Sequence, residues 1–173
     1  NKKSDFFEKF ENYNFNVWQK SLSGNLSSNF IITKSVSKYM LKKKSGSIIN
    51  IASDVGIISP DHRIYEENKK TNYKGVDFNT PLSYSVSKSG IISMTRYLAT
   101  YWAKFGIRVN CISPAGVYKK QDKKFVEQLS DRIPLGRMAR KHEFNGAIIY
   151  LCSNASSFVT GHNLVIDGGR TIW

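Results

Sequence analysis

Short apolar runs alternate with segments of helical periodicity along most of the chain. The apolar runs are SIINIAS, IRVNCISP and NLVIDGG, and each ends at a glycine, a proline or a polar cluster. Runs of this length predict strands buried on both faces of a parallel sheet. Apolar residues recur at helical spacing in residues 18–40, 83–106, 121–132 and 142–156. This alternation predicts an α/β fold whose parallel strands are joined by right-handed crossovers.

The sheet that these runs predict is incomplete. A doubly wound, Rossmann-like sheet binds its ligand where the strand order switches, outside the carboxyl ends of the strands. Only three strands are clear here, so they supply one side of such a switch. We therefore expect residues 1–173 to form one partial domain with flanking helices, in which the N-terminal, nucleotide-binding half is absent.

A long polar segment, residues 57–81, separates the first predicted strand from the helix that follows it. Its sequence is IISPDHRIYEENKKTNYKGVDFNTP. A connection of this length is usually functional or mobile. We treat it as an insertion loop of the domain.

The composition is that of a globular protein. The chain has 173 residues, of which 40% are hydrophobic, and no apolar run of about 18 residues that would span a bilayer. The charged, aromatic start does not resemble a secretory signal. These features predict a cytoplasmic protein without a membrane partner.

Cysteine and histidine give no sign of a metal site. Cys111 and Cys152 lie in apolar segments without a CxxC pattern, so we expect buried free thiols and a reducing compartment. His62, His142 and His162 are scattered, which predicts surface or capping residues.

The formal net charge of +13 raises the question of nucleic-acid binding. The lysines, however, stand in short groups spread along the chain, and no nucleic-acid-binding module is recognisable. We expect no nucleic-acid partner, and keep a basic nucleic-acid-binding domain as the least favoured alternative.

One chemistry-bearing pattern, a tyrosine four residues before a lysine, occurs at several places. The pairs are Tyr39 with Lys43, Tyr65 with Lys69, and Tyr84 with Lys88. Residues four apart share one face of any helix, so the spacing does not distinguish a catalytic pair from a solvated one. The context of each pair must decide.

Six segments, in order, carry a family resemblance. They are GNLSSNF, GSIINIASDVG, YSVSK, IRVNCISP, IPLGRM and VTGHNLVIDGG. From about Trp18 to Trp173 the chain resembles the C-terminal two-thirds of a classical short-chain dehydrogenase/reductase. The resemblance selects Tyr84 and Lys88, because only this pair follows the strand bearing Ser53 and precedes an IRVN-type strand.

The resemblance implies an NAD(P)-dependent oxidoreductase that moves a hydride between a nicotinamide and a carbonyl or alcohol carbon. Tyr84 would exchange the proton, and a nearby Lys88 ammonium would favour its phenolate. The family's lysine also binds the ribose of the cofactor. A serine at the place of Ser53 bonds the substrate oxygen, and Asn25 occupies the place of an asparagine that supports a water relay. The implied catalytic residues are thus Asn25, Ser53, Tyr84 and Lys88.

The resemblance also implies a set of cofactor contacts. These residues are Ile51, Tyr84, Lys88, Pro114, Ala115, Gly116 and Val117. Two positions depart from the family pattern: Ala115 stands where a glycine is usual, and Lys119 replaces a frequent threonine. The glycine-rich dinucleotide fingerprint and the residue that selects NAD or NADP are not found in the sequence.

From the missing fingerprint we expect a fragment of a protein about 80 to 100 residues longer, inactive alone. A non-catalytic remnant, or a subunit that acts through protein–protein contacts at an exposed sheet edge, is the alternative.

The insertion loop bears on the substrate and on assembly. SPDHRIYEE and DGGRTIW resemble bacterial oxidoreductases of surface-polysaccharide and flagellin-glycosylation clusters, which suggests a small, sugar-like substrate. Asp61 and Arg63, together with Tyr65, would bind its hydroxyls or a phosphate, or else the loop packs on a neighbouring subunit. The helix bearing Tyr97 and Tyr101 suits the helix pairing of a homo-oligomer.

Overall fold

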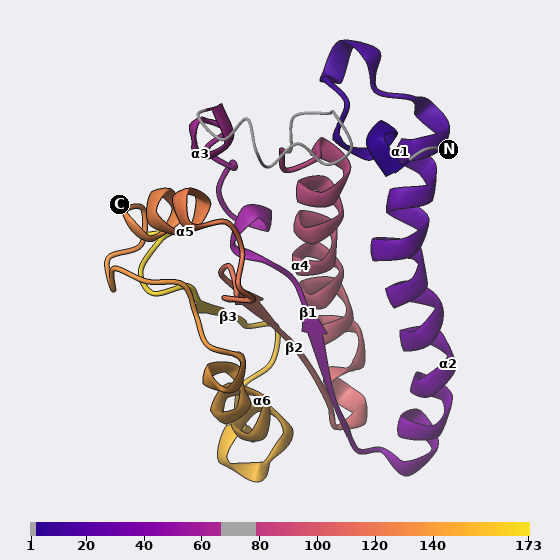
Figure 1. Ribbon diagram of the computed structural model, residues 1–173. Coiled ribbons are helices and arrows are strands. Elements are labelled where there is room, and N and C mark those ends of the chain that lie inside the picture. Colours follow the sequence, from indigo (N-terminus) through magenta and orange to yellow (C-terminus); the bar gives the residue numbers. More distant parts are fainter. Residues whose placement is uncertain (1–2, 67–78) are drawn as a thin grey trace.

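The computed structural model describes residues 3–66 and 79–173, which form a parallel sheet between layers of helices (Figure 1). The strands are β1 (Gly46–Ile51), β2 (Ile107–Pro114) and β3 (Asn163–Ile166). The α-helices are α1 (Phe15–Leu22), α2 (Ser28–Lys43), α3 (Arg63–Glu66), α4 (Leu82–Trp102), α5 (Lys123–Ser130) and α6 (Asn145–Cys152). The predicted α/β class is confirmed.

The strands pair in the order β1-β2-β3, and both pairings are parallel. The β1–β2 register runs from Gly46 opposite Ile107 to Ile51 opposite Ile112. Helices α2 and α4 pack on one face of the sheet, and α6 packs on the other. Helices α3 and α5 gather at the carboxyl ends of the strands, near the C-terminus of the chain (Figure 1). This end of the sheet is where a doubly wound fold places its ligand.

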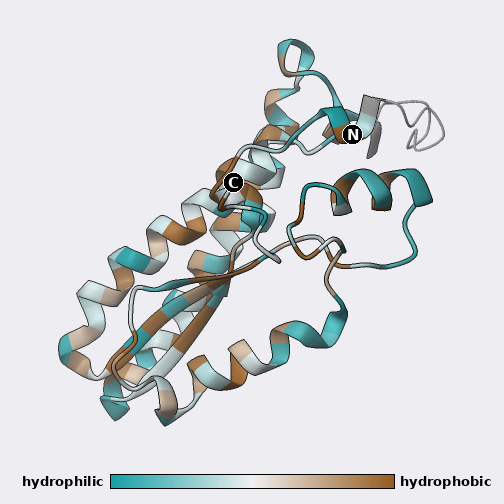
Figure 2. Cartoon of the chain, turned by 90° about the vertical axis from the view of Figure 1, so that its left-hand side faces the viewer, coloured by the Kyte–Doolittle hydropathy of each residue, from teal (hydrophilic) through white to brown (hydrophobic). Residues whose placement is uncertain are grey.

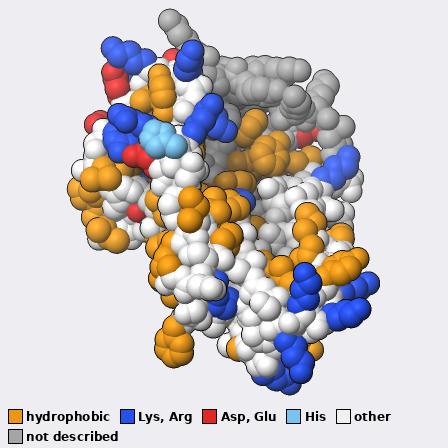
Figure 3. Space-filling model, turned by 90° about the horizontal axis from the view of Figure 1, so that it is seen from below, with side chains coloured by type: hydrophobic (Ala, Val, Ile, Leu, Met, Phe, Trp, Pro, Cys, Tyr) orange, Lys and Arg blue, Asp and Glu red, His pale blue; other side chains and the backbone are white. Residues whose placement is uncertain are grey.

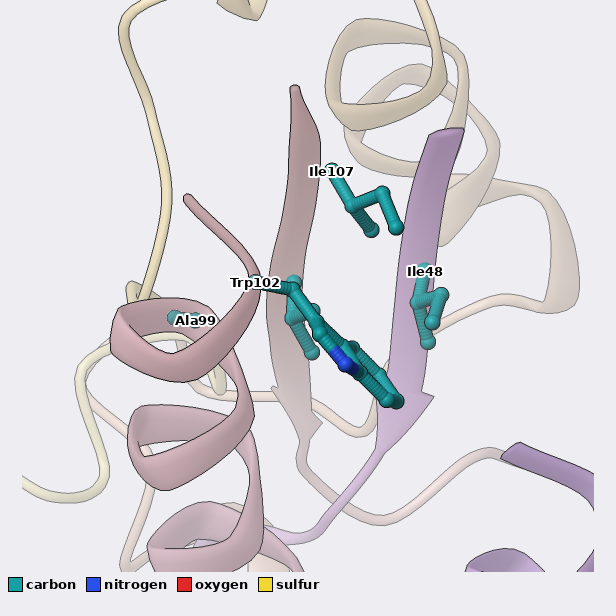
Figure 4. Packing of buried hydrophobic residues seen from close by; sticks show 5 residues of the cluster. Ile48, Ala99, Trp102 and Ile107 are labelled. Carbon is teal, nitrogen blue, oxygen red and sulfur yellow. The ribbon is translucent and has the colours of Figure 1, made fainter. Parts of the chain in front are cut away.

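The core lies between α4 and the sheet, whose strands are predominantly hydrophobic (Figure 2). Trp102 and Ala99 of α4 pack against Ile48 of β1 and Ile107 of β2 (Figure 4). Replacing a buried aromatic of this kind by alanine typically costs about 3–5 kcal/mol. The predicted helical stripe therefore faces the sheet, as its spacing indicates.

The side-chain amides of two buried asparagines hydrogen-bond the strands to neighbouring elements. The Asn50 Nδ2 of β1 donates to Thr95 Oγ1 of α4 at 2.9 Å. Asn110 of β2 accepts from the His162 backbone N–H at 2.9 Å and donates to the Val159 carbonyl at 2.9 Å. Each amide thus ties a strand to the element that packs beside it, and a buried amide without such partners would be costly.

The first predicted helix differs from its expected form. It begins at Phe15 and is divided by a π-helical turn, η3 (Ser23–Ser27), before it continues as α2. Such a turn adds one residue to the helical repeat and is frequent at functional sites. Periodicity alone did not predict it, and the apolar face that periodicity predicts for α2 is wrong. Phe30 and Ile31 are 54% and 59% exposed, whereas Thr33 and Ser37 are buried.

Two further expectations of burial are wrong. Ile51 at the end of β1 is 45% exposed, although both faces of this strand were expected to be buried. Cys152 is exposed at the last residue of α6, whereas Cys111 of β2 is buried as predicted. The three histidines are exposed, in accordance with the prediction.

The described part of the chain contains no helix long and apolar enough to cross a membrane. Within residues 3–66 and 79–173, no group of three His, Cys, Asp or Glu side chains is arranged to hold a metal ion. On the face seen in Figure 3, Lys and Arg side chains stand in separate groups with hydrophobic side chains between them.

The insertion, residues 57–81, is in part helical where a polar loop was expected. Its helix α3 packs on α5 through a small apolar cluster at the carboxyl ends of the strands. The buried members of this cluster are Ile64, Leu129, Ile133 and Met138, with Tyr65, Phe125 and Val126 packed against them. Lys69, the partner of Tyr65 in one Tyr/Lys pair, lies outside the described residues.

Candidate active site

Ser53 is held against α4 by the short 3-10 turn η4 (Asp54–Gly56), which follows β1. A Cβ on Gly56 would lie 2.8 Å from the backbone carbon of Lys88, so only glycine permits this approach. The Ser89 hydroxyl donates to the Gly56 carbonyl at 2.8 Å. The end of β1 and the first turns of α4 are thereby fixed to one another.

The predicted Tyr84/Lys88 pair lies at this junction. Pro81 precedes α4 in an extended conformation, and Tyr84 and Lys88 follow on the first turns of the helix. The Lys88 Nζ donates to the Ile51 carbonyl at 2.9 Å and lies 5.5 Å from the centroid of the Tyr84 ring. Tyr39, by contrast, is 73% exposed on α2. The structure therefore brings Ser53, Tyr84 and Lys88 together, as the sequence predicted.

Burial is the largest influence on the pKa values of Tyr84 and Lys88. It raises the pKa of Tyr84, and the nearby Asp54 charge raises it further, while a hydrogen bond with Ser53 acts in the opposite direction. Burial lowers the pKa of Lys88. Burial of the ring thus acts against the lowering of the pKa of Tyr84 that was expected from the Lys88 ammonium.

Asn25 lies in the π-helical turn η3, which packs against α4. Its Nδ2 donates to the Ser21 carbonyl at 2.9 Å. The neighbouring Leu26 contacts Gly90, where a Cβ would lie 3.0 Å from a Leu26 methyl carbon. The turn is thus seated two residues beyond Lys88 along α4, and the role of Asn25 stays a prediction.

The loop that follows β2 is tied to β3 and to the segment around Ala139. The Ala115 N–H donates to the Ile166 carbonyl at 3.1 Å, and the Ala139 N–H donates to the Gly116 carbonyl at 3.0 Å. Val117 pairs with Ala139 in an isolated parallel bridge. The residues Pro114, Ala115, Gly116 and Val117 therefore present ordered backbone at the carboxyl edge of the sheet, where Ile51 and Ser53 also lie.

Residues of the insertion contact α5 and the segment directly after it. Asp61 accepts from Arg63 Nε at 2.8 Å and from Arg132 Nε at 2.5 Å. Hydrogen bonds from these two arginines hold the pKa of Asp61 well below its usual range. The Tyr65 ring stacks on Phe125 with centroids 5.8 Å apart. Within this protein these contacts join the insertion to α5 and the segment after it, and a role in binding substrate stays a proposal.

A buried ion pair beside Ser53 was not predicted. Asp54, 3% exposed, accepts a hydrogen bond from the Ser53 hydroxyl at 2.9 Å and forms an ion pair with Arg170, which is 8% exposed. Arg170 follows β3 and reaches the site from the far end of the chain. The one available signal was the acidic residue directly after the serine at the strand end.

A hollow of about 830 Å³ lies beside this junction but does not contain it. Its lining comes from the N-terminal segment, the insertion and the outer side of α4, and includes Phe10, Tyr13, Ile57, Leu82 and Val86. Ser53, Tyr84 and Lys88 do not line it. The reactive groups therefore converge outside this hollow.

Comparisons with known proteins agree with this geometry. Residues 5–65 match a family model described as short chain dehydrogenase, and residues 72–171 match one described as Enoyl-(Acyl carrier protein) reductase. An NAD-dependent glycerol dehydrogenase of Listeria innocua is 32% identical over 170 residues, which cover 95% of this chain and 60% of that protein.

Two solved structures have the same arrangement of elements. A short chain dehydrogenase from Leptospira borgpetersenii with bound NAD+ has a TM-score of 0.84 at 36% identity, covering 96% of this chain and 61% of that one. A gluconate 5-dehydrogenase from Burkholderia cenocepacia, in complex with NADP and tartrate, has a TM-score of 0.81 at 26% identity, covering 95% and 60%. This chain thus spans about 60% of the length of such relatives. By its matched segments and its Rossmann-like arrangement, the chain belongs to the short-chain dehydrogenase/reductase family.

Proposed function

We propose that the protein containing this chain is an NAD(P)-dependent oxidoreductase that interconverts a carbonyl and an alcohol on a small, sugar-like substrate. The observation that carries the proposal is the convergence of Ser53, Tyr84 and Lys88 at the carboxyl end of β1. A phenol, an ammonium and a hydroxyl in one partly buried place are the groups that proton exchange with a substrate oxygen requires.

A nicotinamide dinucleotide fits the residues present, and when bound it supplies or accepts the hydride. Ile51, Tyr84, Lys88 and the backbone of the loop 114–117 would hold it. Support comes from a hollow of about 790 Å³ beyond that loop, lined by Val117, Tyr118, Lys119, Lys120 and Lys141. A lysine-lined hollow suits an anionic ligand. The choice between NAD and NADP stays open.

Each residue of the site would have a separate role in the reaction. Tyr84 would deliver a proton to the developing alkoxide, and its raised pKa keeps the phenol protonated and ready to donate. Ser53 would hydrogen-bond the substrate oxygen. Its hydroxyl donates to Asp54 in this structure, so Ser53 would accept from a substrate alcohol and would have to turn away from Asp54 to donate to a carbonyl. Lys88 would support Tyr84, and Asn25 would support a water relay behind the lysine.

The substrate class rests on the insertion and on named relatives. The glycerol and gluconate 5-dehydrogenases act on polyhydroxylated molecules by their names. Asp61 and Arg63 would bind hydroxyls of such a substrate from the insertion, although their contacts in this structure also join the insertion to α5. In the complete protein, the exposed and mutually stacked Tyr97 and Tyr101 of α4 would contribute to a homo-oligomer.

Substitutions at two tyrosines test the proposed chemistry in the full-length protein. Tyr84→Phe removes the proton donor, and we expect kcat with a polyol substrate to fall about 10²- to 10⁴-fold. Tyr39→Phe is the matched control, because Tyr39 has the same spacing to a lysine but is exposed on α2. Equal losses in both variants, or full activity of Tyr84→Phe, would refute the assignment.

A second function, as a non-catalytic subunit, is favoured by one observation. No described strand pairs with the outer edge of β1, and such an edge is a template for another chain. The coding sequence upstream separates the two functions. A glycine-rich turn after an apolar strand within about 100 residues supports the oxidoreductase, and a start codon directly before Asn1 supports the subunit.

A further inference from the structure

The ion pair between Asp54 and Arg170 lies beside the candidate site. It joins the turn after β1 to the segment after β3, and β1 and β3 are the two outer strands of the described sheet. One oxygen of the Asp54 carboxylate accepts from the Ser53 hydroxyl at 2.9 Å and from the Val55 N–H at 2.8 Å. The other oxygen accepts from the Arg170 guanidinium. Both oxygens of this buried carboxylate are thus engaged, and one of their partners is the hydroxyl assigned to the substrate oxygen.

Arg170 is itself held in place by the turn after β3. Asp167 accepts from the Gly169 N–H at 2.9 Å and from the Thr171 N–H at 2.7 Å. The Arg170 N–H lies 3.4 Å from the Asp167 carbonyl. Gly168 and Gly169 have φ values of 68° and 93°, which other residues rarely adopt. This turn therefore directs the guanidinium towards Asp54.

Charge is the reason that the pair matters for Tyr84. A carboxylate near a buried phenol disfavours the phenolate, whereas a compensating cation reduces this effect. Asp54 is one of the influences that raise the pKa of Tyr84. The charged and titratable groups around Tyr84 are Asp54 on η4, Lys88 on its own helix and, through Asp54, Arg170 from the segment after β3. Tyr65 of α3 feels the same two charges in opposite directions.

We propose that Asp54 and Arg170 are positioning residues of this site: the carboxylate fixes the Ser53 hydroxyl, and the guanidinium compensates the charge that the carboxylate imposes on Tyr84. The proposal rests on the proposed function, because Tyr84 is taken as the proton donor. It concerns the protonation of one residue, and this can be measured without turnover.

The test is a titration of Tyr84 by NMR in the chain of residues 1–173 labelled with ¹³Cζ-tyrosine. The Tyr84 signal is assigned by its loss in Tyr84→Phe. Asp54→Asn keeps the shape of the side chain and removes its charge, and we expect the Tyr84 midpoint to move to lower pH by at least about half a pH unit. Arg170→Gln leaves the carboxylate uncompensated, so the midpoint should move to higher pH.

Three further variants make the test specific. Arg170→Lys restores the charge and should return the midpoint towards that of the unsubstituted protein. The double variant Asp54→Asn/Arg170→Gln buries no unpaired charge, so it can be measured even if Arg170→Gln does not fold. Its Tyr84 midpoint should lie between those of the two single variants. Glu143→Gln is the matched control, since Glu143 forms an exposed ion pair with Arg137 elsewhere, and it should leave the midpoint unchanged.

An unchanged Tyr84 midpoint in Asp54→Asn, or shifts in the same direction in Asp54→Asn and Arg170→Gln, would overturn the proposal. In the full-length protein, the same variants should displace the pH profile of kcat in the same two directions. If the full-length protein shows no turnover at all, the proposed function fails while the titration still decides the role of the pair.

Discussion

The side chains of Tyr84 and Tyr65 respond to the same two influences, burial and the charge of Asp54. Burial is the larger for both, and both pKa values lie above that of a free phenol. Tyr65 also shares a hydrogen bond with Thr80, at 2.8 Å between the two hydroxyl oxygens. The charge of Asp54 thus acts on two partly buried phenols, one on α3 and one on α4.

These raised pKa values predict a loss of stability at high pH. The unfolded chain releases phenol protons from about pH 10 upwards, whereas the folded chain retains those of Tyr65 and Tyr84. Their stabilising contribution is therefore complete below about pH 10 and is lost as the pH rises through the folded-state pKa values. We expect Tyr65→Phe and Tyr84→Phe to show a smaller fall in urea midpoint between pH 8 and pH 11.

The exposed Tyr97→Phe is the control for this measurement and should follow the unsubstituted chain. Tyr65→Phe also loses its hydrogen bond with Thr80, so its stability at pH 8 should be lower by about 0.5–1.5 kcal/mol. If all three variants fall in parallel with pH, the two buried phenols do not govern alkaline stability.

At this scale, sequence reasoning selected residues whose neighbouring segments follow a recognisable order, and it missed residues that are brought together by distant contacts. Ser53, Tyr84 and Lys88 were found because the segments around them follow one another in a recognisable order. Asp54 and Arg170 were missed because a pair separated by 116 positions leaves no trace in periodicity. Their burial depends on the tertiary fold, which charge and spacing in the sequence do not specify.

Among the elements, the contact between η4 and α4 decides the geometry of the candidate site. The turn carries Ser53 and Asp54 at its start and touches the backbone of Lys88 at Gly56. The contact is close enough that a displacement of the turn moves Ser53 relative to Tyr84. The precision of the site therefore depends on one glycine.

Gly56→Ala tests this dependence. The new methyl would lie 2.8 Å from the Lys88 backbone carbon, and we expect the free energy of unfolding to fall by about 1–3 kcal/mol, as for other overpacked sites. Gly146→Ala in α6 is the control, because a Cβ there meets nothing within 4 Å and alanine favours a helix by about 0.5–1 kcal/mol. Chemical denaturation distinguishes the two, and a neutral Gly56→Ala would contradict the close contact.

Elements with a strong pattern were predicted well, and elements stabilised by their neighbours were not. The spacing of Ile91 and Trp102 predicted α4, and Gly106, with φ 70°, ends the segment as expected. The π-helical turn at Asn25 and the helix α3 were not predicted. The former is seated on Gly90, and the latter is held on α5 by Tyr65 and its neighbours, so both depend on contacts that the local sequence does not contain.

For the whole molecule, the important feature is the free side of β1. The sheet of the described residues ends at β1, and Ile51 is exposed there, beside the residues that would hold the cofactor. The relatives are longer, and two of them are solved with a bound dinucleotide. A cofactor site at this edge is lined on one side by the described residues, and no described strand lies on the other side of β1.

We therefore predict that purified residues 1–173 will not oxidise NADH or NADPH at a measurable rate, as followed at 340 nm with a polyhydroxylated ketone. The full-length protein measured in parallel is the positive control. Clear turnover by residues 1–173, abolished by Tyr84→Phe, would show that the described half suffices.

The ion pair of Asp54 with Arg170 also has a consequence for biosynthesis. The ribosome releases Asp54 long before Arg170, since 116 positions separate them, and domains begin to fold during synthesis. Until the segment after β3 emerges, the Asp54 carboxylate has no cation to accompany it into the interior, and burying it alone is costly. Closure of the serine turn is thereby coupled to synthesis of the segment after β3, so that products terminated before Arg170 would keep this turn open and accessible to quality-control proteases.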